Sequence, residues 1–135
     1  MATNGTDLTA YYHHVQTAGS LRTEMHAKRW STAVLKSLGF NLDRRTKKQL
    51  ANALPDELAN DLTRIFWLLH FRNMKLELNE FLNQISRRSG NSDWQFAKIP
   101  TRAVFHAVKE MIDNDLSDKV ADSLAPEVSE LWKNA

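Results

Sequence analysis

The residues of this chain most suited to binding chemistry are four cations in one short segment. Directly after Asp43 come Arg44, Arg45, Lys47 and Lys48. Asp43 is a typical helix N-cap, so the cations are expected in the first turns of a helix, where the helix dipole disfavours positive charge by about 0.3 to 1 kcal/mol each. A phosphate backbone, an anionic membrane surface or an acidic partner would each explain this placement. A solvated basic face that aids solubility is the simpler explanation.

The second candidate is an apolar partner surface formed by Phe66, Trp67 and Leu68. These residues interrupt the amphipathic pattern of a helix predicted over residues 54–71, which we expect to be the central helix of the fold. The last turns of this helix are apolar on every side. Such turns must be covered either by the rest of the fold or by a partner, and the sequence leaves both explanations open.

Histidine is the one strong transition-metal ligand available, because the chain has no cysteine. His13 and His14 are adjacent, so on a helix they point about 100° apart and cannot grip one metal ion as an i, i+4 pair could. The remaining histidines have no other ligand at the spacing of a recognised zinc motif; these are His26, His70 and His106. The sequence therefore predicts no metal site.

No motif typical of an enzyme is present either. The chain has no glycine-rich phosphate loop and no nucleophile elbow. The paired carboxylates Asp56 and Glu57 follow Pro55, which is typical of the first turn of a helix, where negative charge is favourable. We expect no catalytic residue and no cofactor, and hence a protein that is not an enzyme.

Length and composition indicate a single domain of 135 residues, large enough for its own hydrophobic core. The formal net charge of +2 is too small to indicate nucleic-acid binding by itself. The first residues are polar and lack the apolar run of a signal peptide, and no segment approaches about 18 uninterrupted apolar residues. We therefore expect a soluble cytoplasmic protein that does not insert into a membrane.

The spacing of apolar residues predicts an all-α fold. A first helix is expected to begin near Asp7, and a second is expected over residues 21–38, ended by Gly39. In the second half, Pro100 falls inside the predicted long helix, so this helix either kinks there or begins there after a turn. Ser92 and Gln95 have capping-box spacing, which favours the earlier start and the kink.

The same apolar pattern returns without a gap after 70 residues, which predicts a tandem duplication of a four-helix unit. The two units span about residues 7–70 and 77–135 of one helical bundle domain, with eight helices in total. The pattern places eight residues in equivalent buried positions: Val34, Leu38, Leu50, Leu54, Val104, Val108, Val120 and Leu124.

The third helix of the second half has the opposite charge. It carries Asp113, Asp115, Asp118 and Asp122 around a single Lys119. If the two halves are related by pseudo-symmetry, the molecule is expected to have one basic end and one acidic end. A polar molecule of this kind favours association with other proteins, or with copies of itself.

Several segments together resemble a known family. They are residues 11–15 (YYHHV), 32–39 (TAVLKSLG), 50–55 (LANALP), 79–82 (NEFL) and 101–104 (TRAV). This pattern resembles the bacterial and archaeal proteins grouped as domain of unknown function 2267, over about Leu8 to Trp132. The motifs are packing motifs, so the resemblance implies an all-helical architecture and no particular chemistry.

We therefore expect a non-catalytic module that binds another protein or itself. The alternative is an anion or nucleic-acid binder that uses the four cations of the third helix, together with Arg87 and Arg88. Ionic strength separates the two, because phosphate binding weakens steeply as salt increases, whereas binding to an apolar surface does not.

Overall fold

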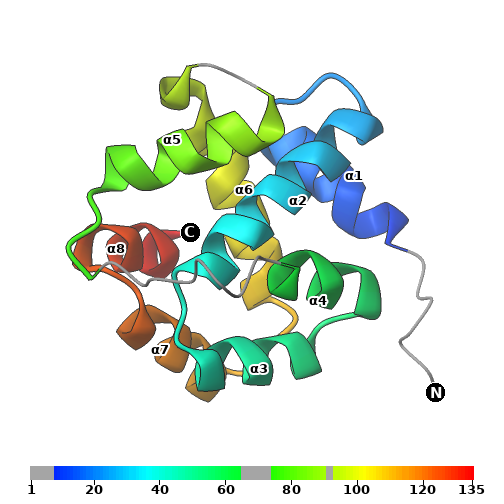
Figure 1. Ribbon diagram of the computed structural model, residues 1–135. Coiled ribbons are helices and arrows are strands. Elements are labelled where there is room, and N and C mark those ends of the chain that lie inside the picture. Colours follow the sequence, from blue (N-terminus) through cyan, green and yellow to red (C-terminus); the bar gives the residue numbers. More distant parts are fainter. Residues whose placement is uncertain (1–7, 65–73, 91–92) are drawn as a thin grey trace.

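The computed structural model describes residues 8–64, 74–90 and 93–135. In these ranges the chain forms eight α-helices and no strand, which confirms the predicted all-α class and the predicted number of helices (Figure 1). No helix in these ranges is long and apolar enough to cross a membrane. The helices are α1 (Thr9–Ala18), α2 (Glu24–Phe40), α3 (Arg44–Ala53), α4 (Asp56–Thr63), α5 (Leu78–Ser89), α6 (Lys98–Lys109), α7 (Asn114–Ser123) and α8 (Pro126–Asn134), with a short 3₁₀ helix η2 (Trp94–Ala97) before α6.

The two third helices begin at equivalent aspartate caps. The backbone N–H of Thr46 donates to Oδ1 of Asp43 over 2.7 Å, and the N–H of Leu116 donates to Oδ1 of Asp113 over 2.8 Å. Each bond satisfies one of the N–H groups that a helix N-terminus leaves without a partner. The predicted N-cap role of Asp43 is confirmed, so the cations that follow it do lie in the first turns of α3.

The prediction that Gly39 ends the second helix is wrong, because α2 continues to Phe40. Gly39 is buried, and a Cβ atom added to it would lie only 2.0 Å from the carbonyl oxygen of Leu62. The glycine is therefore needed for the close approach of α4 to α2 rather than as a helix stop.

The predicted kink at Pro100 is also wrong, and the alternative that the helix begins beside this proline holds. α6 begins at Lys98, so Pro100 lies in its first turn, where the missing N–H costs no helix bond. The 3₁₀ helix η2 precedes it, and the N–H of Gln95 donates to Oδ1 of Asp93 over 3.0 Å at its start. Ser92 lies outside the described residues.

The helix predicted over residues 54–71 is shorter than expected. α4 ends at Thr63, and Arg64 has the non-helical ψ of 78°. The hydroxyl of Thr63 donates to the carbonyl of Ala59 over 2.9 Å, a side-chain bond that competes with the backbone ladder.

α4 is also not the central helix. The centre is occupied by α2 and α6, and α4 packs at the edge against α2 and α3 (Figure 1). α1 packs on α6 while α5 packs on α2, so the first helix of each half contacts the second helix of the other half. α3 contacts both α4 and α7, and α8 contacts α5, α6 and α7.

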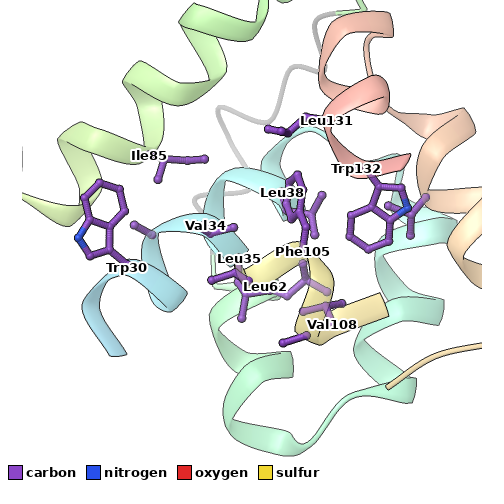
Figure 2. Close-up of a cluster of buried hydrophobic side chains, with 14 of the residues drawn as sticks. Trp30, Val34, Leu35, Leu38, Leu62, Ile85, Phe105, Val108, Leu131 and Trp132 are labelled. Carbon is purple, nitrogen blue, oxygen red and sulfur yellow. The ribbon is translucent and has the colours of Figure 1, made fainter. Parts of the chain in front are cut away.

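One continuous hydrophobic core runs between these helices (Figure 2). Phe105 of α6 is fully buried, and its ring centroid lies 5.1 Å from that of Trp132 and 6.1 Å from that of Phe81. The eight predicted core residues are confirmed, since each is buried: Val34, Leu38, Leu50, Leu54, Val104, Val108, Val120 and Leu124.

Candidate functional site

The four predicted cations lie on α3. Arg44, Arg45 and Lys48 are exposed, whereas Lys47 is partly buried. Burial lowers the pKa of Lys47, and the nearby charge of Arg44 lowers it further. Among the residues that the structure describes, none of the four has a carboxylate oxygen within 4.0 Å. Of the four, Arg44, Arg45 and Lys48 thus combine exposure with the lack of an ion pair among the described residues.

The acidic helix α7 packs directly against α3, so the expectation of separate basic and acidic ends is wrong (Figure 1). The backbone N–H of Asp43 donates to Oγ of Ser123 over 2.8 Å, and the Ser123 hydroxyl lies 3.0 Å from Oδ2 of Asp43. These bonds join the two helices. Opposite charges end up side by side because the two third helices contact each other.

We refer to the exposed charges of these two helices as the mixed-charge face. They are Arg44, Arg45 and Lys48 of α3 with Asp115, Asp118, Lys119 and Asp122 of α7. Between the helices lies a recess of about 300 Å³, lined in part by Arg45, Gln49, Lys119 and Asp122. Oε1 of Gln49 is buried there without a hydrogen-bond partner in the described part of the chain.

A second hollow, of about 610 Å³, lies at the connection between α1 and α2, and nothing in the sequence analysis predicted it. We refer to this hollow as the basic-apolar groove. The side chains in its walls include Arg22, His26, Arg29, Phe96 and Ile99. Two pairs of residues that line this groove are 70 positions apart in the sequence. His26 of α2 pairs in this way with Phe96 of η2, and Arg29 of α2 pairs with Ile99 of α6. A signal was present in the sequence, because an offset of 70 positions pairs polar residues of the first half with apolar residues of the second half.

Comparison with protein-family models places this chain in a family. The family DUF2267, described as an uncharacterized conserved protein, matches residues 9–131, which is nearly the whole chain. The chain belongs to the DUF2267 family. The resemblance carried by the helical packing motifs is thereby confirmed. A search among curated proteins found no match to the chain.

The other candidate residues of this DUF2267 protein either lie outside the described residues or form bonds within the fold. Phe66, Trp67 and Leu68, the candidate apolar surface, lie outside the described residues, as does His70. Arg88 of α5 is engaged by the fold: its Nη1 donates to the Ser37 hydroxyl over 2.9 Å, and partial desolvation lowers its pKa.

The structure brings together two histidines that the sequence treats as unrelated. The rings of His14 on α1 and His106 on α6 stack with centroids 5.4 Å apart, and Nε2 of His106 lies 3.6 Å from Oε1 of Glu110. Within residues 8–64, 74–90 and 93–135, no three His, Asp or Glu side chains form a set of metal ligands. Sequence spacing could not reveal this pair, because it depends on the packing of α1 against α6.

A polar cluster links α1 and α2 to α4 in the DUF2267 fold. The Tyr12 hydroxyl donates to Oε2 of Glu57, and the Thr32 hydroxyl donates to Oδ2 of Asp61 over 3.2 Å. Burial raises the pKa of both Tyr12 and Asp61, and Glu57 raises both further. The two bonds join α1 and α2 to α4.

Proposed function

We propose that this protein is a non-catalytic interaction module that binds another protein, or a second copy of itself, through the mixed-charge face. The observation that carries the proposal is the contact of α3 with α7, which puts exposed cations and exposed carboxylates on neighbouring helices. A face with both signs matches a partner whose own charges alternate. Two copies related by a two-fold axis satisfy this condition, because α3 of one copy then faces α7 of the other.

The alternative is an anion or nucleic-acid binder that uses the cations of α3. The absence of a carboxylate within 4.0 Å of any of these cations, among the described residues, favours this alternative. The carboxylates of Asp118 and Asp122 disfavour it, because they lie on the adjacent helix and repel a phosphate backbone that passes over α3. A protein partner is therefore the better match.

Charge reversal on α3 tests both functions. Arg44→Glu together with Arg45→Glu should leave the fold intact, because exposed charges contribute little to stability. A protein partner should then be recovered about tenfold less in a pull-down from the organism's own cells, or a self-associated form should dissociate in sedimentation velocity. The matched control is Lys98→Glu together with Lys133→Glu, which makes the same charge change at exposed positions of α6 and α8.

The outcomes separate the two readings. The nucleic-acid alternative is supported if the pull-down recovers nucleic acid instead of protein. This recovery should be lost in the Arg44 and Arg45 variant, and in the wild type it should be lost between low and moderate salt. If the recovery of protein and of nucleic acid falls no more in the Arg44 and Arg45 variant than in the control variant, the cations of α3 serve solubility alone.

The internal duplication is also a proposal. It is supported by the bounds of α3 and α7, which are offset by 70 residues at both ends, and by the matching backbone angles of Leu54 and Leu124. Sequence profiles built separately from the two halves of DUF2267 proteins should match each other at this offset. Profiles that match no better than those of unrelated helical proteins would refute the duplication. The cytoplasmic location stays a prediction from the sequence.

A further inference from the structure

The basic-apolar groove is built where the two halves of the chain meet. The connection between α1 and α2 and the first turns of α2 form one wall, and the end of α5 with η2 and the start of α6 forms the other. Its volume of about 610 Å³ lies within the range of ordinary ligand sites. The groove and the mixed-charge face use different residues, so each can act independently of the other.

The apolar part of the groove is unusually exposed. Phe96 is 67% exposed and Ile99 is 54% exposed, and both line the hollow. The nearby Trp30 is buried and lies at the boundary between groove and core. Single exposed apolar residues are common on protein surfaces, but two that share one hollow make an apolar patch that a partner can cover.

The charged part of the groove has one sign. Arg22 and Arg29 supply this charge, His26 also lines the groove, and no carboxylate of the described residues belongs to its lining. Nδ1 of His26 is buried and has no hydrogen-bond partner among the described residues. Positive charge beside apolar walls attracts carboxylates more strongly than a fully solvated cation does, because the local dielectric constant is lower.

The basic lining continues beyond Ile99. This residue also borders a neighbouring hollow of about 260 Å³, which is lined by Arg102 and the stacked pair His14 and His106. Arginines therefore line both hollows that Ile99 borders, and the lining of the second hollow also includes Ala135. The arrangement suits a ligand that is apolar in the middle and acidic on either side.

We propose that the basic-apolar groove binds a short segment of a partner protein in which a bulky apolar side chain is flanked by carboxylates. A free anion would gain nothing from Phe96 and Ile99. Single-stranded nucleic acid is bound by stacking successive bases on exposed rings, whereas among the described residues Phe96 is the one exposed aromatic side chain in the lining. An acidic amphipathic peptide uses both the charges and the apolar walls.

The test begins with a library of displayed random peptides of about 12 residues, selected on the full chain. We expect the selected peptides to share a bulky apolar residue with Asp or Glu on both sides. A fluorescently labelled selected peptide should bind about tenfold more weakly to the variant Arg22→Glu with Arg29→Glu, and also to Phe96→Ala. It should bind unchanged to Arg44→Glu with Arg45→Glu, which makes the same charge change on α3.

Thermal melts show whether each variant is folded. If the reversal at Arg22 and Arg29 lowers the melting temperature, Phe96→Ala still tests the groove. Three results would overturn the proposal. They are a selection without acidic residues, equal weakening by the α3 reversal, and competition by single-stranded DNA at least as strong as that by the peptide. If only the groove variants lose peptide binding, the groove is the peptide-binding site. This result holds even if the α3 variant shows that the mixed-charge face has no partner.

Discussion

Replacing Phe105 with Ala is expected to destabilise the protein by about 3 to 5 kcal/mol, because it removes a ring that is fully buried at the centre of the core. The ring meets Trp132 edge-on (Figure 2). It also packs beside the ring of Phe81. Aromatic pairs of this kind add about 0.5 to 1.5 kcal/mol beyond the apolar area they bury. The loss is a large fraction of the roughly 5 to 15 kcal/mol that stabilises a typical domain. Urea unfolding followed by circular dichroism measures it.

The matched control is Phe96→Ala, which deletes the same atoms from a side chain that is mostly exposed. Its cost should stay within about 0.5 kcal/mol, since little apolar surface is returned to water. Equal losses for the two variants would mean that Phe105 is not at the centre of the core.

Truncating Leu38 or Leu54 to Ala is expected to cost about 2 to 5 kcal/mol at each position. Leu38 lies fully buried on α2, the helix that contacts α1, α4, α5 and α6, so the cavity opens among several helices that cannot all close it. Leu54 is buried at the C-terminal end of α3, beside the turn that leads into α4. Chemical denaturation of each single variant gives the loss directly.

Met25→Ala is the control for these truncations, because Met25 also belongs to α2 and its side chain is exposed. A change within about 0.5 kcal/mol is expected there. If Leu38→Ala and Leu54→Ala also cost less than about 0.5 kcal/mol, the buried faces of α2 and α3 are assigned wrongly.

The helices and their buried faces could be predicted because both depend on neighbours in the sequence. A helix repeats every 3.6 residues, so the spacing of apolar residues marks the face that must be covered. A cap such as Asp43 acts on an N–H three positions later. These local rules were sufficient for α3 and for all eight predicted core residues.

Where one residue type has two structural uses, the sequence alone favoured the wrong one. Glycine often follows the end of a helix, but Gly39 is needed for contact with Leu62, more than twenty positions away. Proline either kinks a helix or starts one, and Pro100 lies in the first turn because η2 occupies the segment before it. In both cases the deciding contact or segment is not encoded in the spacing of neighbouring residues.

The candidate sites divide in the same way. The sequence by itself determined that four cations follow Asp43 at the start of a helix and that three aspartates follow Asp113 in the corresponding helix of the second half. Only the tertiary structure decided that these helices lie side by side, joined by the bonds between Asp43 and Ser123, and that Arg22 and Arg29 share a groove with Phe96 and Ile99. The physical reason is that the side chains within a segment determine which face of a helix is buried, whereas the segment that covers this face is chosen by packing between residues far apart in the sequence. Asp43 and Ser123, for example, are 80 positions apart.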